Sequence, residues 1–251
     1  MGFYIKDARE IQAMREAGRI VAGALDHIAA QVKVGATLAQ LERACKEFIT
    51  ANGGKPAFLG YKGFPGAICI SVNDQVVHGI PNGRRVAESD LVKIDIGVLK
   101  YGLYADGART FVVGAVSARI RELVAATERA LYLGIEQARA GNKLSDISWA
   151  VQRYVEAHGF SVVRELSGHG VGIELHEEPA VPNFGKPGTG ARLKAGMTLA
   201  IEPMVNLGSY EVRTEANDWT VATRDGQPSA HFEHTILVTE GPAEILTREK
   251  F

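Results

Sequence analysis

The chain repeats part of its own sequence at an offset of 106 residues, and this repeat constrains the fold more than any other feature. "MRE" at residues 14–16 matches "IRE" at residues 120–122. Seven further pairs follow at the same offset: Gly35 and Gly141, Leu38 and Leu144, Leu41 and Ile147, Ala44 and Ala150, Phe48 and Tyr154, Ile49 and Val155, and Gly53 and Gly159. The pattern favours an internal duplication, although two amphipathic helices of equal length could also resemble each other by chance.

Secondary-structure patterns agree with two related halves. Apolar spacing predicts four amphipathic helices, at roughly 8–31, 38–52, 118–140 and 144–157. Each helix pair is followed by β-like sequence, "AICISV", "LVKIDIGV" and "ARTFVVG" in the first half and "GMTLAIEPMV", "WTVAT" and "FEHTILVT" in the second. No Pro/Ser-rich linker separates them. We therefore expect one α+β domain over residues 1–251, with halves at roughly 1–115 and 116–251.

Composition excludes several classes of protein. The 28 basic and 29 acidic residues nearly balance and form no basic stripe, so no nucleic-acid partner is expected. Cys45 and Cys69 are the two cysteines, which argues against a disulfide framework or a thiolate zinc site. No apolar run reaches the ~18 residues of a membrane span, and "MGFYIKDARE" lacks the apolar region of a signal peptide. We expect a cytoplasmic protein without a membrane partner.

Acidic residues interrupt apolar runs that otherwise have the pattern of strands. Apolar side chains alternate along residues 92–97, and Asp95 lies inside this run, where aspartate is normally depleted. A second strand is expected to begin near Leu103 and contains Asp106. These two carboxylates are the first candidates for a functional site.

A hairpin would bring Asp95 and Asp106 together. With Lys100 and Tyr101 at the turn, opposite residue numbers sum to 201, as 95 and 106 do. The two aspartates would then face each other with Cβ atoms ~5 Å apart, and they would repel unless one is protonated or a cation lies between them. The register could slip by one residue, and Asp106-Gly107 could instead be a turn.

The second half contains the same anomaly. "LAIEPMV" includes Glu202 and "AHFEHTILV" includes Glu233. One strand glutamate is usually a solvated or edge charge, but four carboxylates in four apolar segments are harder to explain in that way. "SGHGVGIELHEEP" (residues 167–179) adds His169 and His176 on a glycine-rich backbone. Carboxylates with one imidazole suit Mn²⁺, Fe²⁺, Co²⁺ or Zn²⁺, and this many fit two ions ~3.5–4 Å apart.

A mononuclear iron oxygenase is a competing interpretation. His176 and Glu178 have the His-x-acid spacing of an iron triad, with His231 or His234 as the third ligand. The pattern is short and leaves most of the strand carboxylates unexplained. The chain has no His-Glu-x-x-His zinc motif, phosphate-binding loop or Gly-x-Ser-x-Gly elbow.

Five segments occur in a fixed order along the chain: "SVNDQVVHGIP" (71–81), "KIDIGVLKYGLYADGART" (93–110), "SGHGVGIELHEEP" (167–179), "AIEPMV" (200–205) and "HFEHTILVT" (231–239). Together they resemble type I methionine aminopeptidases. The resemblance covers essentially the whole chain. It implies the pita-bread fold, in which two pseudo-twofold-related halves of antiparallel sheet are backed by helices. It also implies removal of N-terminal methionine from nascent proteins and peptides with a small second residue. The chain's own start, Met1-Gly2, meets this rule.

The resemblance implies a role for each candidate residue. Two divalent ions (Co, Mn, Fe or Zn, which the sequence does not distinguish) would lower the pKa of a water and hold it as the hydroxide that attacks the first peptide bond. Glu202 would move a proton, His176 would donate to the developing oxyanion, and His78 would lie near the scissile nitrogen. The implied metal ligands are Asp95, Asp106, His169, Glu202 and Glu233, and the implied methionine pocket is Phe58, Tyr61, Phe64, Cys69, Leu175 and Trp219.

Other interpretations of the same fold stay open. An Xaa-Pro aminopeptidase-like hydrolase would share the ligands, and a non-catalytic binding module would usually have lost some of them. The motifs around His169 and Glu202 are 33 residues apart, 202 − 169, which leaves no space for the type II insertion. The larger N-terminal domain of prolidases is not expected, because helices start by Ala8. Glu177 and Glu178 match no ligand and are interpreted as structural. The expected partner is the N-terminus of a nascent chain; docking at the ribosome stays open, and we expect a monomer.

Overall fold

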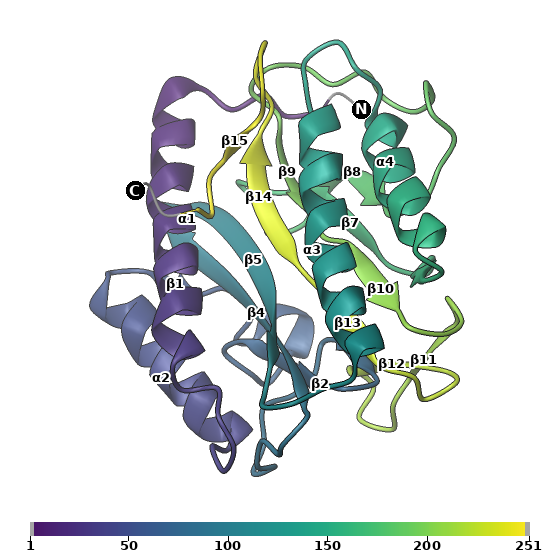
Figure 1. The fold of residues 1–251 in the computed structure, drawn as a ribbon. Helices are drawn as coiled ribbons and strands as arrows, with labels where there is room; N and C mark the ends of the chain where they lie inside the picture. The colour runs from purple at the N-terminus through teal and green to yellow at the C-terminus, as the bar shows by residue number, and fades with distance from the viewer. Residues whose placement is uncertain (1–2, 249–251) are drawn as a thin grey trace.

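Four α-helices lie where the apolar spacing predicts them in a computed structural model, which describes residues 3–248 (Figure 1). They are α1 (Ala8–Ala29), α2 (Leu38–Ala51), α3 (Ala118–Gln137) and α4 (Leu144–Ala157). Asp7, Thr37 and Ser117 accept hydrogen bonds from the first-turn N–H groups of α1, α2 and α3, which explains where these helices begin. The start Met1-Gly2 lies outside the described residues.

The repeat at offset 106 appears in the backbone. Helices α2 and α4 occupy the same positions at this offset, and matching glycines flank them. Gly35 and Gly141 precede the helices with φ of 90° and 94°, and Gly53 and Gly159 follow them with φ of 71° and 70°. Glycine adopts this left-handed conformation without the strain that a Cβ would add. Both halves therefore keep the glycines that begin and end the same helix, which supports the duplication.

A nine-stranded antiparallel sheet joins the two halves. Along the sheet the order is β1-β4-β5-β14-β9-β7-β8, with β2 also paired to β4 and β15 to β14. Two three-stranded sheets, β13-β10-β6 and β11-β12-β3, lie beside it. The strands are β1 (Lys55–Pro56), β2 (Cys69–Val72), β3 (Gln75–Val77), β4 (Leu91–Lys100), β5 (Leu103–Val112), β6 (Ser161–Val162), β7 (Ser167–Gly170), β8 (Glu177–Pro182), β9 (Thr198–Ile201), β10 (Met204–Asn206), β11 (Val212–Thr214), β12 (Val221–Thr223), β13 (Ser229–His231), β14 (Glu233–Leu237) and β15 (Glu244–Ile245).

The β4–β5 hairpin forms as predicted, but its register is shifted. Asp106 lies opposite Gly97, so opposite residue numbers sum to 203 and the prediction of 201 was wrong. The turn consists of Tyr101 and Gly102, with φ of 53° and 81°. A two-residue hairpin turn favours such left-handed pairs with glycine second, which sets the turn one residue later than predicted. Asp95 and Asp106 are therefore diagonal neighbours on one face, and Asp106 lies inside β5 and not in a turn.

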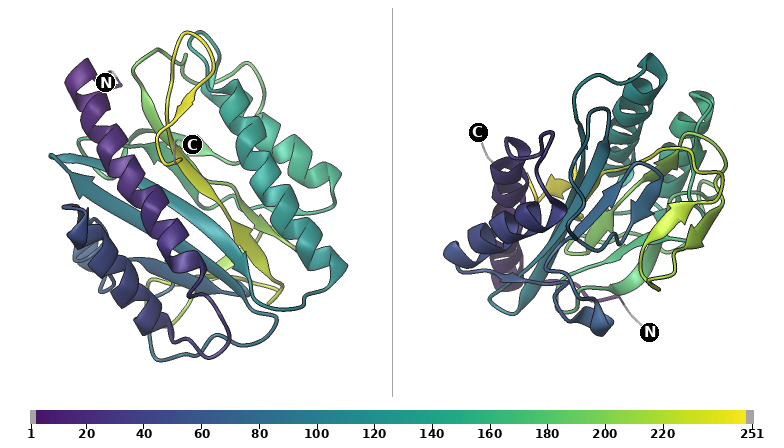
Figure 2. Two further views of the ribbon diagram at one scale, coloured as in Figure 1. Left: turned by 60° about the vertical axis from the view of Figure 1, so that its left-hand side comes forward. Right: turned by 90° about the horizontal axis from the view of Figure 1, so that it is seen from below.

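The helices cover one face of the large sheet (Figure 2). Helix α1 packs on β4 and β5, and α3 packs on β9 and β14. Side chains alternate along a strand, so Ile94 and Ile96 of β4 enter the core beneath α1 and α2 while Asp95 points to the opposite face. Within residues 3–248, no helix is both long enough and apolar enough to cross a membrane.

Candidate active site

One cavity of about 340 Å³ collects every residue that the sequence placed in the site. It lies on the sheet face away from the helices, because the same alternation that buries Ile94 directs Asp95 outward. Its lining includes the five candidate ligands Asp95, Asp106, His169, Glu202 and Glu233, the histidines His78 and His176, and the apolar residues Phe58, Tyr61, Phe64, Cys69, Leu175 and Trp219.

Four carboxylates share this poorly hydrated space. Burial raises the pKa of Asp95, Glu202 and Glu233 well above their ordinary values, and the neighbouring carboxylates raise these pKa values further. Burial also raises the pKa of Asp106 to about 6, although the Thr235 hydroxyl, which donates to its Oδ1 at 2.9 Å, opposes this shift. Asp95 Oδ1 is buried and has no hydrogen-bond partner among the described residues. Without a cation, this arrangement disfavours the charged form of every carboxylate.

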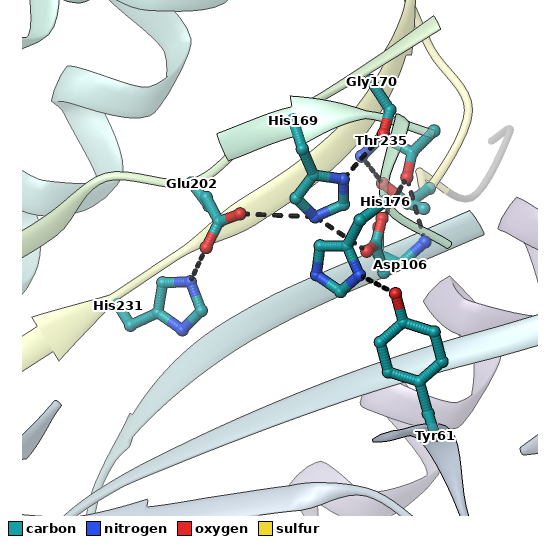
Figure 3. A network of polar contacts seen from close by, with 9 residues as sticks. Tyr61, Asp106, His169, Gly170, His176, Glu202, His231 and Thr235 are labelled. Carbon is teal, nitrogen blue, oxygen red and sulfur yellow. Dashed lines mark hydrogen bonds and ion pairs between the residues drawn. The ribbon is translucent and has the colours of Figure 1, made fainter. Parts of the chain in front are cut away.

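The two ring nitrogens of His169 have different surroundings (Figure 3). Nδ1 lies 2.8 Å from the Gly170 carbonyl, which can only accept, so Nδ1 carries the proton. Burial lowers the pKa of His169 to about 4, so the ring is neutral near pH 7. The Nε2 lone pair then faces Asp106 Oδ2 and Glu202 Oε1, each at 3.5 Å. A lone pair that faces two carboxylates favours a cation, or a proton on one carboxylate, between them.

The donor set therefore fits divalent metal ions. One ligand atom from each of Asp106, His169 and Glu233 lies within 4.8 Å of the others, and all three residues are buried. Asp95 and Glu202 line the same cavity and bring the set to four carboxylates and one imidazole. Such a set suits borderline divalent ions. Cations bound by this set would give partners to the orphaned Asp95 oxygen and to the Nε2 lone pair.

His176 lies at the mouth of the cavity, on the turn that precedes β8. Its Nδ1 is 2.9 Å from the Tyr61 hydroxyl, and the two rings stack with centroids 5.3 Å apart. The His169 ring lies 4.2 Å away. Burial, with His169 next, lowers the pKa of His176 to about 4, so it is a neutral hydrogen-bonding group. His78 has a left-handed φ of 58°, and burial lowers its pKa also.

An apolar cluster forms the other wall. Phe58, Phe64, Cys69 and Leu175 are buried together, and Trp219 packs edge-on to Phe64 with ring centroids 5.2 Å apart. Burial raises the pKa of the Cys69 thiol well above its ordinary value, so the thiol stays protonated and behaves as a small apolar group.

Two contacts in the site were not predicted. His231 Nε2 lies 3.7 Å from Glu202 Oε2 (Figure 3), and Thr235 binds Asp106. The alternation of His231, Glu233 and Thr235 places them on one side of the chain, and this period of two was the available signal. Of the two candidates for the third ligand of an iron triad, His234 points instead to Tyr132 and Thr247, on the helix side of the sheet, and His231 lies beside Glu202.

Comparisons with known proteins agree with this geometry. Metallopeptidase family M24 matches residues 12–240. Methionine aminopeptidase 1 of Bacillus subtilis is 50% identical over 97% of this chain and 98% of its own length. The crystal structure of methionine aminopeptidase from Thermotoga maritima is 46% identical, with a TM-score of 0.97 over 99% of this chain and 100% of that one.

A more distant likeness concerns the fold alone. Prolidase from Pyrococcus furiosus is 24% identical, with a TM-score of 0.80 over 98% of this chain but 66% of that one. The pita-bread architecture is thus shared with enzymes of another specificity, while the high identities are to methionine aminopeptidases. The chain therefore belongs to metallopeptidase family M24, among the type I methionine aminopeptidases, which remove N-terminal methionine in a metal-dependent reaction.

Proposed function

We propose that Asp95, Asp106, His169, Glu202 and Glu233 hold two divalent metal ions beside a methionine pocket, and that the N-termini of nascent chains are cleaved there. The observation that carries this proposal is the His169 Nε2 lone pair directed at two carboxylates in a cavity with four of them. When bound, the metals supply a water of lowered pKa at neutral pH. The donor set accepts Co, Mn, Fe or Zn, and availability decides among them.

Glu202 moves the proton in this proposal. Its Oε1 lies 3.5 Å from His169 Nε2 and its Oε2 lies 3.7 Å from His231 Nε2, so the carboxylate stands between two imidazole rings. A buried carboxylate whose pKa is raised well above its ordinary value is better suited than a solvated one to accept a proton from the attacking water and pass it to the leaving amine.

His176 and His78 act on the substrate amide. If the Tyr61 hydroxyl donates to His176 Nδ1, the proton of His176 resides on Nε2, where it can donate to the oxyanion that develops on the scissile carbonyl. His78 lines the same cavity and is assigned to the scissile nitrogen. Neutral rings suit both tasks, because each needs one N–H donor and no net charge.

The apolar wall selects the side chain of the first residue. Aromatic rings and the protonated Cys69 thiol suit an unbranched thioether. An apolar pocket discriminates by only about 1–3 kcal/mol per methylene-scale change, so norleucine is expected to be a poor to fair substitute that is still cleaved. The second residue is expected to be small, such as Gly, Ala or Ser, and the free α-amine is expected to be essential.

The experiment adds each divalent ion back to metal-free enzyme and follows hydrolysis of Met-Ala-Ser, Leu-Ala-Ser, Met-Leu-Ser, Ala-Pro-Ser and acetyl-Met-Ala-Ser. We expect cleavage of Met-Ala-Ser alone at high rate, with up to two ions bound per chain by native mass spectrometry. Equal cleavage of the leucine peptide would remove the pocket assignment, and full activity without metal would overturn the ligand set.

A further inference from the structure

Glu177 follows His176 in the chain, and both of its carboxylate oxygens accept hydrogen bonds. The role proposed for His176 does not by itself explain these contacts. Glu177 Oε1 accepts the backbone N–H groups of Ile173 and Glu174 at 2.6 and 3.1 Å. Its Oε2 accepts from Lys6 Nζ. One carboxylate thus closes the turn that leads into His176 and also ties that turn to a distant part of the chain.

Lys6 comes from the segment before α1, and its side chain is 1% exposed. The backbone N–H of Lys6 donates to the Gly196 carbonyl at 2.9 Å, which fixes the segment to the second half. In Figure 1 the segment before α1 runs behind α3 and crosses the molecule to α1. A Cβ on Gly172 would lie 2.2 Å from Lys6 Cε, so the glycine leaves the space that the lysine needs.

The turn held by these contacts places two groups of the site. Its first residue, Gly172, accepts from the Tyr104 N–H at 2.7 Å. Leu175 is 1% exposed and lies in the apolar wall, and His176 follows with its Nδ1 at the Tyr61 hydroxyl. A change in the turn would therefore displace both the pocket wall and the group assigned to the oxyanion.

We propose that Lys6 and Glu177 are positioning residues, which hold the turn of residues 172–177 so that His176 meets the scissile carbonyl. The inference rests on the proposed role of His176 in the reaction. Without Lys6, the Glu177 carboxylate keeps two backbone donors but loses its cation. A poorly hydrated carboxylate without a counter-charge is stabilised when it rotates toward water. That rotation releases the N–H groups of Ile173 and Glu174 and frees the turn.

The first test compares Lys6→Met and Glu177→Gln, which keep the side-chain bulk, with Arg15→Met. Arg15 of α1 makes a two-bond ion pair with Glu244 of β15, both at 2.8 Å, away from the cavity. We expect Lys6→Met and Glu177→Gln to lower kcat about 10- to 100-fold at unchanged metal content, as a small misplacement of a reacting group does. Arg15→Met is expected to lower Tm but to keep kcat within about twofold.

The second test repeats Lys6→Met in a His176→Ala background. We call the contact between Lys6 and Glu177 the clamp. If the clamp acts through His176, Lys6→Met should change kcat by less than about twofold in the His176→Ala background, because coupled residues are not additive. An equal loss of kcat in both backgrounds would show that Lys6 does not act through His176 and would overturn the proposal.

The third measurement is independent of activity. Hydrogen exchange at the Ile173 and Glu174 amides in metal-free protein should accelerate in Lys6→Met and stay unchanged in Arg15→Met. Unchanged exchange in Lys6→Met would overturn the clamp even for an active enzyme. A wild-type chain that leaves Met-Ala-Ser intact would instead refute the proposed function, while the exchange result still decides whether the clamp holds the turn.

Discussion

At the scale of single residues, the two histidines of "SGHGVGIELHEEP" differ in what their free nitrogen faces. His169 Nε2 faces Asp106 and Glu202, deep in the cavity, whereas His176 is anchored by Tyr61 at its mouth. The ring centroids are 4.2 Å apart, so proximity alone does not separate their roles. Their partners do, since one ring faces two carboxylates and the other is held by a tyrosine hydroxyl.

His169→Ala should therefore lose bound metal, while His176→Ala should keep it. Removal of one donor to a developing oxyanion typically lowers kcat about 10²- to 10³-fold, and we expect this loss for His176→Ala. Metal per chain is measured by atomic absorption after gel filtration, beside kcat on Met-Ala-Ser. Equal metal loss in the two variants would show that the roles have been divided wrongly.

Asp95→Asn tests the crowding of the carboxylates. Asp95 Oδ1 has no partner among the described residues, and burial and Asp106 raise its pKa. The neutral amide removes one charge from the cluster, so the metal-free variant should have a higher Tm than metal-free wild type at pH 7.5. The same change should abolish metal binding and activity. A Tm below that of metal-free wild type would argue that the carboxylates do not repel one another in the empty site.

At the scale of elements, helix positions followed from the sequence and the strand register did not. Helix α2 was predicted at 38–52 and spans Leu38–Ala51, because apolar spacing and a capping residue are local signals. The partner of Asp106 depends on which two residues form the β4–β5 turn, and a shift of one turn residue moved it from Asp95 to Gly97. Spacing therefore predicted that the aspartates share a face, but not how they pair.

The register also decides what lies beside the methionine pocket. A Cβ at Gly97 would lie 2.5 Å from Phe58 Cε1, inside the apolar wall. Gly97→Ala should push this ring into the pocket and raise KM for Met-Ala-Ser about tenfold with little change in kcat. Steady-state kinetics with methionine and alanine peptides measure the shift, which should penalise the longer side chain more.

Gly102→Ala is the matched control in the same hairpin. Gly102 has φ of 81° and no atom within 4 Å of an added Cβ, so alanine there is strained but not crowded. It should cost about 1 kcal/mol of stability and leave KM unchanged. If both variants changed KM equally, the effect would belong to the hairpin and not to Phe58.

At the scale of the whole molecule, the two halves meet where the ligands meet. Strand β5 of the first half pairs with β14 of the second, and this pairing places Asp106 beside Thr235 and Glu233. The repeat at offset 106 pointed to two halves, and acidic residues inside apolar runs pointed to the proposed ligands. No comparable signal in the sequence indicated contacts between distant segments, such as His231 with Glu202 or Lys6 with Glu177.

Four carboxylates lie close together where the two halves meet. The stability of the metal-free protein therefore depends on pH. Burial raises the pKa of Asp95, Glu202 and Glu233 well above their ordinary values in the folded state. The folded chain then binds more protons than the unfolded chain, so this contribution to stability is lost as pH rises. Buried histidines act oppositely, since the pKa of His169 and His234 falls to about 4, but only below their ordinary pKa of 6.5.

Above pH 7 the histidines are neutral in both states, but buried Lys93, whose pKa burial lowers to about 7, loses its proton in the folded chain only, and its contribution to stability rises with pH against that of the carboxylates. Metal-free protein should lose the carboxylate contribution to Tm as pH rises from 6.5 to 8. Protein saturated with Mn²⁺ should not, because the ions favour ionised ligands and compete with protons for them. The difference in Tm between metal-loaded and metal-free protein should thus widen from pH 6.5 to 8, as differential scanning calorimetry at fixed ionic strength can measure. A difference in Tm that stays constant over the same window would mean that the four carboxylates are already ionised and compensated by the protein itself, and the ligand set would then have no need of a cation.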